Sequence, residues 1–431
     1  MTVVIQRTLR FRDLQVTRRI LVLLIAAGGL LAQQYEFNDA HFHLTNYIQE
    51  GTDIHKFLEI MGSGTGRVAI FGIPLQQQWS FRVDADNAPT YYLNTDAPLY
   101  YYSFTDAFIA MAYKSLPPEQ RARLDPMITG FNPTDMYAAD HIRRVLKTFP
   151  GVFTGIGEFS IHKEFVSAKV AGGVASLQDP ALDRILDFAG EAGLLVLIHN
   201  DIDVPFAKED STPAYLSQAK AVFKRHPQTT IIWAHTGMGR VVRPVKNHAA
   251  MIADILRDPD FNHVYFDISW DEVAKYIVSS PEATRITADL VNRYPDRFLF
   301  GTDEVAPSDR AKYVRVYEIY KPLWNLLTPD ASRKVRLDNY ERLFDQARLK
   351  VRAWESAHVS IGDRRWNPSY CPFIEHCPYR GHSRAGSVLP GTHLSGGSSG
   401  HRQISCLGCA KLPRSVPDGL PSAFLEPERI Q

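Results

Sequence analysis

The sequence predicts a (β/α)8 TIM barrel with a long insert after strand two and a disordered C-terminal tail. Short runs rich in β-branched and aromatic residues alternate with longer segments whose apolar residues recur every three or four positions. This alternation is typical of βα units that surround a parallel sheet. Eight such units fit within about 270 residues, which is the usual size of one barrel.

The elements can be placed in order along the chain. The eight strands are expected at residues 37–43, 68–75, 126–132, 153–160, 194–201, 230–237, 263–269 and 297–304. The clearest helical patterns lie at 139–148, 180–192, 213–226, 249–257 and 281–294.

The insert, about residues 76–124, follows strand two and should therefore lie over the barrel mouth. Its aromatic stretch at Tyr91–Phe108 either packs an additional helix or contacts a substrate directly. In both cases an insert of this size would limit access to the mouth and help to exclude water.

The composition describes a protein with a large core and almost no net charge. Hydrophobic residues make up 45% of the 431 residues, and 48 basic residues stand against 47 acidic ones. The first value excludes a chain that is disordered throughout. The second argues against nucleic-acid binding through bulk electrostatics.

The two ends of the chain differ from the middle. Residues 1–32 resemble a signal peptide, because several arginines precede the apolar run Ile20–Ala32; a buried or anchoring helix is the alternative. We expect the barrel domain at 33–357 and a low-complexity tail at 358–431. If the first segment is cleaved, the protein is exported to the periplasm or the exterior and has no stable membrane association; otherwise it is cytoplasmic.

Polar residues stand at the ends of the predicted strands. His41 and His43 end strand one and are two positions apart, which places them on one face of a strand. Four other strands also end in such residues: Glu158, His199, His235 and Asp303. Because the carboxyl ends of barrel strands meet at one mouth, we expect all six to converge there.

These residue types suit a catalytic metal centre. Borderline cations such as zinc favour imidazole and carboxylate ligands, and catalytic sites leave a position open for water. A neighbouring carboxylate can take a proton and later deliver it to a leaving group. No cysteine occurs before Cys371, so a metal site in the main domain must use His, Asp and Glu.

At this point the sequence resembles the amidohydrolase superfamily, within it the amidohydrolase-related branch of metal-dependent hydrolases and decarboxylases. The resemblance covers about residues 36–350. It rests on D-A-H-F-H, G-I-G-E, L-I-H-N, W-A-H-T-G and F-G-T-D, followed by N-Y-E-R-L-F at Asn339–Phe344. In this order and spacing the set of motifs is specific.

The resemblance implies a role for each strand-end residue. His41 and His43 match the strand-one pair that binds the more buried metal, and Asp303 matches the aspartate that ligates it and moves protons. His199 matches the strand-five ligand. His235 matches the strand-six histidine, which is a ligand in two-metal members and often contacts substrate or water in one-metal members.

Glu158 matches the strand-four position, where two-metal members carry a bridging carboxylate or a modified lysine. It therefore permits two metals. The alternative is a carboxylate that pairs with Lys163 or supports the site from behind. The expected cofactor is a divalent metal, zinc in the first place and one or two per chain, with manganese or iron as alternatives.

Other residues after the strands are candidate substrate contacts. Arg240 could hold a carboxylate or phosphate, or could cap a helix or lie at the surface. Asn200 is a second predicted substrate contact, and Asp39 is expected to orient the strand or a ligand. Three weaker candidates lie on the same side: His162, Trp270 and Glu304.

The leading interpretation is a metal-dependent hydrolase that acts on an ester, lactone, amide or similar bond of a small molecule, with Asp303 and His235 as catalytic residues. The first alternative is a non-oxidative decarboxylase of the same superfamily with one metal. The second is a secreted, non-catalytic binding protein. Substrate identity and homo-oligomer formation stay open at this stage.

Overall fold

The computed structural model describes residues 35–359 except 48, 78–97, 165, 172–174 and 209. The predicted signal-like segment, the tail beyond residue 359 with its four cysteines, and residues 91–97 of the aromatic stretch Tyr91–Phe108 lie outside the described residues. In the described part of the chain, no helix combines the length and the apolar character needed to cross a membrane.

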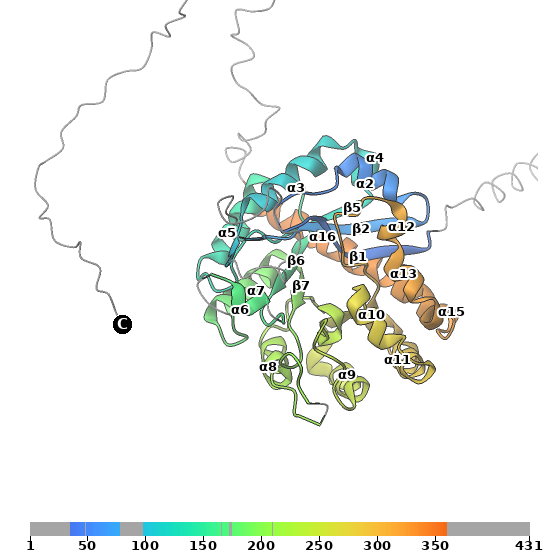
Figure 1. Cartoon of the computed structure of the whole chain (residues 1–431). Helices are drawn as coiled ribbons and strands as arrows, with labels where there is room; N and C mark the ends of the chain where they lie inside the picture. The colour runs from blue at the N-terminus through green and yellow to red at the C-terminus, as the bar shows by residue number, and fades with distance from the viewer. Residues whose placement is uncertain are drawn as a thin grey trace, which may run out of the picture. The chain divides into compact units, whose positions relative to one another are not determined.

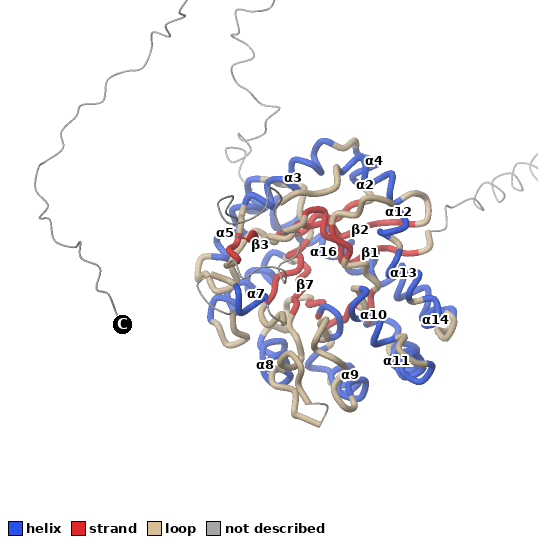
Figure 2. Tube along the Cα trace, in the orientation of Figure 1, coloured by secondary structure: helices blue, strands red, loops and turns tan. Residues whose placement is uncertain are grey.

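A curled sheet of parallel strands forms the centre of the structure (Figure 2). Among the described residues it holds nine strands in the spatial order β10-β9-β8-β7-β6-β5-β2-β1-β11. Their bounds are β1 Phe37–Thr45, β2 Thr65–Gly72, β5 Leu124–Ile128, β6 Gly155–Ser160, β7 Leu195–His199, β8 Ile231–Trp233, β9 Val264–Asp267, β10 Phe298–Leu299 and β11 Glu304–Val305. Each of the eight predicted strands is confirmed, and the last one is divided into β10 and β11.

The eighth barrel strand, which is divided into β10 and β11, closes the sheet into a barrel. β10 pairs with β9, and β11 pairs with β1. Between them the Ala40 N–H donates to the Phe300 carbonyl at 3.0 Å, and the Asp303 N–H donates to the His41 carbonyl at 2.7 Å. The predicted (β/α)8 barrel is therefore confirmed.

Helices surround the strands on the outside (Figure 1). They are α2 Ile54–Met61, α3 Phe104–Ser115, α4 Pro118–Arg121, α5 Ala138–Thr148, α6 Val166–Lys169, α7 Pro180–Ala192, α8 Leu216–Arg225, α9 His248–Arg257, α10 Asp271–Ile277, α11 Pro281–Arg293, α12 Arg310–Tyr313, α13 Arg315–Ile319, α14 Lys321–Trp324, α15 Pro329–Arg333 and α16 Asn339–His358. The five predicted helices correspond to α5, α7, α8, α9 and α11, each within three residues of the expected bounds.

Helix α7 shows why its bounds could be read from the sequence. The Asp179 carboxylate accepts the Ala181 N–H at 3.0 Å, which caps the amino end, and Pro180 occupies the first helical position. The helix ends at Gly193, whose φ of 75° is left-handed. Glycine adopts this conformation at little energetic cost, so it is the usual residue after a helix.

The core consists of an inner and an outer layer. Inner strand residues such as Ala69, Leu197 and Leu299 pack together with Tyr340 and Phe344 of α16. The Tyr340 hydroxyl also donates to Asp125 near the start of β5, at 2.8 Å. Helix α16 therefore covers the amino-terminal end of the barrel, and the carboxyl ends of the strands are left for the site.

The insert after β2 contributes structure to that carboxyl-terminal side. β3, Leu75–Gln77, pairs antiparallel with β4, Leu99–Tyr101, and α3 follows. The Tyr101 side chain lines the central cavity, whereas Phe104 at the start of α3 is half-exposed. The described part of the insert thus includes both the additional helix and a cavity-lining aromatic residue.

Candidate metal centre

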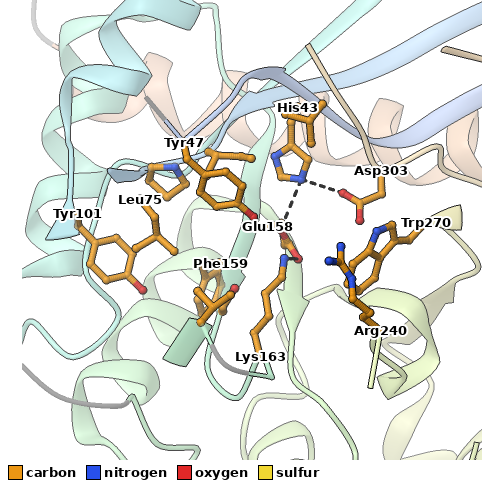
Figure 3. A pocket seen from close by; sticks show the side chains of 15 residues that line it. His43, Tyr47, Leu75, Tyr101, Glu158, Phe159, Lys163, Arg240, Trp270 and Asp303 are labelled. Atoms are coloured by element: carbon orange, nitrogen blue, oxygen red, sulfur yellow. Dashed lines mark hydrogen bonds and ion pairs between the residues drawn. The ribbon is translucent and has the colours of Figure 1, made fainter. Parts of the chain in front are cut away.

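The first half of the site joins residues of β1, of β6 and of the segment between β10 and β11. His43 Nε2 lies 2.9 Å from Asp303 Oδ1 and 3.4 Å from Glu158 Oε2. His41 Nε2 lies 3.2 Å from Asp303 Oδ1 and 3.9 Å from Glu158 Oε2. All four side chains are buried or nearly so, and their donor atoms are close enough to share one ion; His43, Glu158 and Asp303 are drawn in Figure 3.

The second half uses the other oxygen of Glu158. His199 Nδ1 lies directly against Glu158 Oε1, and His235 Nε2 lies 3.8 Å from the same oxygen. These three residues form a second group whose donor atoms could hold an ion. The structure thus brings together all six predicted strand-end residues, although they span more than 260 positions of sequence.

Asp39 does not join this group. Its carboxylate accepts the Thr302 N–H at 2.8 Å, the His41 N–H at 3.1 Å and the Tyr313 hydroxyl at 3.0 Å. The pairing of β1 with β2 shifts register between Asp39 and Phe42, so strict alternation along β1 is interrupted there. Asp39 consequently ties β1 to strand eight, in keeping with the expected orienting role.

Several backbone positions at the strand ends are unusual. His235, Trp270 and Asp303 have φ angles of 56°, 74° and 50°, which are uncommon for residues other than glycine. Such conformations raise the energy of the backbone and occur where the surrounding structure holds a side chain in a functional position. Each of the three follows a strand end and presents its side chain to the site.

Gly301 allows the segment between β10 and β11 to pass close to His41. A Cβ atom at this position would lie 2.6 Å from the His41 Cβ, which is closer than real contacts allow. The glycine of F-G-T-D therefore brings Asp303 within reach of both histidines of strand one.

A buried carboxylate at the end of β9 determines which ring nitrogen carries the proton in two histidines. Asp267 Oδ2 accepts the His41 Nδ1–H at 3.0 Å, so the neutral form of this imidazole presents Nε2 to the site as an acceptor. Ser269 Oγ donates to Asp267 Oδ1 at 2.6 Å, and its oxygen therefore accepts from His235 Nδ1 at 2.9 Å. His235 Nε2 is left unprotonated toward the site in the same way.

Asp201 has the same relation to His199, with its Oδ1 3.1 Å from Nε2. Sequence reasoning did not assign these supporting roles to Asp201, Asp267 or Ser269. The signal was present, because D-I-S and H-N-D each place a polar residue two positions from another, on one side of the chain.

The electrostatics of the cluster suit a cation. Burial alone would lower the pKa of His41, but Asp303, Asp267 and Glu158 raise it to about 9. Burial would raise the pKa of Asp303, yet His41 and the hydrogen bond with His43 bring it below its ordinary value. Buried ionised carboxylates therefore surround the histidines, and positive charge is needed to balance them.

Two buried nitrogen atoms provide the structural test for a metal. Among the described residues, His41 Nε2 and His235 Nε2 have no hydrogen-bond partner, although neither is accessible to solvent. Buried polar atoms are almost always satisfied, so an orphaned pair that points at carboxylates is the mark of a ligand set. The residues present therefore fit a divalent cation bound by imidazole and carboxylate groups.

Lys163 forms an ion pair with the shared carboxylate. Its ammonium group lies 2.8 Å from Glu158 Oε1, and it follows Glu158 by five residues, in the segment after β6. Lys163 and His199 lower the pKa of Glu158 well below its ordinary value even though burial opposes this. Both readings of Glu158 from the sequence thus describe part of the geometry, since it faces the histidines and pairs with Lys163.

Three residues of the cluster, His43, Glu158 and Asp303, line a cavity of about 180 Å³ (Figure 3). Arg240 lines it with the guanidinium 5.6 Å from the centre of the Trp270 ring. The Arg240 Nε is also 3.3 Å from Glu272. The lining comprises His43, Tyr47, Ile73, Pro74, Leu75, Tyr101, Glu158, Phe159, Ser160, Lys163, Val166, Arg240, Trp270, Asp303 and Val305.

Three other predicted contacts lie away from the cavity lining. Asn200 is buried and its amide donates to the Asp201 carbonyl at 2.9 Å. Glu304 pairs with Lys312 at 3.2 Å, which gives it a structural role. His162 stacks on a tyrosine ring, with the two ring centres 3.7 Å apart.

Comparison with solved structures finds similar chains at low sequence identity. A candidate 2-pyrone-4,6-dicarboxylic acid hydrolase from Pseudomonas putida is 14% identical, with 73% of this chain and 98% of that chain covered and a TM-score of 0.45. A dihydroorotase from Campylobacter jejuni is 14% identical, with coverage of 72% and 83% and a TM-score of 0.42. An amidohydrolase from Burkholderia multivorans with bound zinc is 13% identical, with coverage of 77% and 95% and a TM-score of 0.37.

The family comparison covers most of the chain. No match was found among curated proteins. The sequence model of the amidohydrolase family matches residues 39–346, which include every residue of the candidate metal centre. The chain therefore belongs to the amidohydrolase family and is an enzyme of the amidohydrolase type.

Proposed function

We propose that this enzyme hydrolyses an ester, lactone, amide or similar bond of a small molecule, and that Asp303 moves the protons of the reaction. The observation that carries the proposal is the convergence of His41, His43, Asp303 and Glu158 on one buried point of the cavity wall. This arrangement offers two imidazoles and two carboxylates with room beside them for water and a carbonyl group.

A divalent cation, when bound, lowers the pKa of water and polarises a carbonyl group. We propose zinc as this cation, because two or three imidazoles with carboxylates are typical zinc ligands. The expected ligands are His41, His43 and Asp303, with Glu158 from strand four; His199 and His235 complete the set on the other side. Manganese and iron are the alternatives that the same donor atoms accept.

Asp303 is suited to proton transfer by its position. Its Oδ1 lies between the two histidines of strand one, and its Oδ2 lies 3.7 Å from His235 Nε2. Its pKa is below the ordinary value, so the carboxylate is ionised, and we propose that it accepts a proton from attacking water whose own pKa a bound cation would lower. It then returns this proton to the leaving group on the same side of the cavity. His235 is fully buried behind the residues that line the cavity, and we propose that it contacts the attacking water rather than the body of the substrate.

Arg240 and Trp270 supply a binding surface on the opposite side of the cavity from Tyr47 and Tyr101 (Figure 3). A guanidinium is always charged and can hold a carboxylate through two hydrogen bonds. Burial raises the pKa of both tyrosines, so they face the cavity as neutral hydroxyl groups. We therefore propose a small substrate with a flat or apolar body and one acidic group.

The test is a hydrolysis panel with zinc-reconstituted protein. The panel pairs carboxylated esters, lactones and amides with uncharged counterparts, and Asp303→Asn is the comparison variant. General acid–base catalysis contributes about 10²- to 10⁴-fold, so kcat should fall by about that factor. Undiminished hydrolysis by Asp303→Asn would contradict the proposed role.

A second candidate function is non-oxidative decarboxylation with one metal. The ion pair between Lys163 and Glu158 favours it, because this pair engages the carboxylate that two-metal members use as a bridge. The same substrate panel, extended to aromatic and unsaturated acids, separates the two reactions through the release of carbon dioxide. Hydrolysis without carbon dioxide supports the first function, and carbon dioxide without hydrolysis supports the second.

A further inference from the structure

The two halves of the metal centre are not equivalent, and Glu158 shows the difference. Its Oε2 faces His43 and His41 at 3.4 Å and 3.9 Å. Its Oε1 faces His199 and His235 in the second half. Only Oε1 is also engaged by Lys163, whose Nζ lies 2.8 Å away.

Lys163 is held in this place from several sides. Its side chain is 11% exposed, and its Nζ lies 5.7 Å from the centre of the Trp270 ring, within the range of a cation–π contact. The backbone N–H of Lys163 donates to Ser167 Oγ at 2.8 Å, which anchors the start of the segment that carries it. In Figure 3 the side chain extends to Glu158 along the cavity wall.

An ammonium group at this position already supplies a positive charge to the second half. It has three donors and no acceptor, so it cannot itself be a metal ligand, and its charge beside Oε1 opposes the binding of a second cation there. Two cations on one carboxylate oxygen repel each other strongly at low dielectric. The first half carries no such lysine contact among the described residues, and its four donor groups remain available to an ion.

We propose that the Lys163 ammonium takes the place of a second metal ion, so that the centre binds a single divalent cation in the half formed by His41, His43, Asp303 and Glu158. The proposal rests on the metal dependence stated under the proposed function and specifies its stoichiometry. It also explains why Lys163 lines the cavity, since an ammonium beside the bound ion can contact an anionic oxygen of the substrate.

The second half keeps its capacity for metal when the lysine charge is removed. Asp201 orients His199, and the Ser269–Asp267 pair orients His235, so both histidines are presented independently of Lys163. Substituting the lysine with an uncharged residue should therefore open a second site rather than destroy the first.

The experiment counts metal ions per chain. Wild-type protein, Lys163→Leu and Lys163→Arg are stripped with chelator, incubated with excess zinc chloride, desalted and analysed by elemental mass spectrometry. Leucine retains much of the apolar stem without the charge, and arginine retains the charge. The wild type and Lys163→Arg should hold one equivalent, and Lys163→Leu should hold two.

A double variant, Lys163→Leu with His199→Ala, should return to one equivalent, which places the new ion in the second half. Lys163→Ala serves as an alternative if the leucine variant does not fold, and circular dichroism monitors folding. Two equivalents in the wild type, or one in folded Lys163→Leu and Lys163→Ala, would overturn the proposal. No bound zinc in the folded wild type would instead overturn the metal-dependent function on which it rests.

Discussion

Replacing Asp267 with asparagine should weaken metal binding although the residue is not a ligand in the first half of the centre. Asp267 is fully buried, and its two oxygens have different partners. Oδ1 accepts the backbone N–H groups of His235 and Ser269 at 2.7 Å and 3.2 Å. Oδ2 accepts the Nδ1–H of His41 at 3.0 Å.

Backbone N–H donors would fix the orientation of the side-chain amide of an asparagine at this position. Two N–H donors point at the Oδ1 position, so the amide oxygen must remain there and the NH₂ group must face His41 Nδ1. The imidazole then has to accept on Nδ1 and carry its proton on Nε2, where it points at the metal position. One of the carboxylates that raise the pKa of His41 is lost as well.

The expected size follows from comparable supporting carboxylates. Substituting a residue that orients a metal-binding histidine typically reduces affinity about 10- to 100-fold, or about 1.4–2.7 kcal/mol. The assay is zinc titration of apo-protein against a chromophoric chelator, with circular dichroism as the control for folding.

Asp106→Asn is a matched control. Asp106 is a buried carboxylate that accepts the backbone N–H groups of Thr129 and Gly130 at 2.8 Å and 3.0 Å, and it is not part of the metal cluster. Its substitution should change stability and leave zinc affinity unaltered. Equal zinc affinity for folded Asp267→Asn and the wild type would show that the tautomer argument is wrong.

Arg240→Ala should raise KM for carboxylated substrates about 10- to 100-fold, because a charged hydrogen bond is lost, and should leave KM for uncharged counterparts nearly unchanged. Steady-state kinetics with both kinds of substrate measure the two KM values, and an equal rise for both would contradict the proposed contact. Burial lowers the pKa of His248 to about 4, so between pH 6.5 and 4 the unfolded chain takes up a proton that the folded chain does not, and stability falls as pH falls. From pH 7 to pH 5 urea denaturation should therefore show an extra loss of up to about 2 kcal/mol relative to His248→Gln, and identical pH profiles would argue against it. Gly157→Ala should destabilise the protein by about 1–3 kcal/mol, because a Cβ would lie 2.7 Å from Phe71 Cγ and Thr129 Cγ2; an unchanged denaturation midpoint would be inconsistent with this close packing.

The barrel could be predicted because its signals are local and repeated. Runs of β-branched residues are bounded by turns, and helix ends carry caps such as Asp179 and Gly193. The convergence of His41, Glu158 and Asp303 could be predicted as well, since barrel topology sends every strand end to the same mouth. The signal-like segment and the C-terminal tail stay predictions, because they lie outside the described residues.

The partners of each side chain could not be predicted in this way. Lys163 pairs with Glu158, and Asp267 faces His41 across 226 positions of sequence. Asn200 follows its strand as the motif suggests and still lies outside the cavity lining. A strand end specifies the mouth at which a residue lies, but its rotamer and its hydrogen-bond partners depend on neighbouring strands and loops.

The sequence thus determines the barrel and the set of potential ligands, because these follow from residue type and periodicity along one chain, and its motifs and the match to the sequence model identify the family. The inequality of the two halves of the metal centre comes from packing between distant segments. A shift of register in β1 turns Asp39 away, and the closure of strand eight against β1 brings Asp303 to both histidines. Periodicity carries no information on distances of 3 to 4 Å between separate strands, and the chemistry of this site depends on those distances.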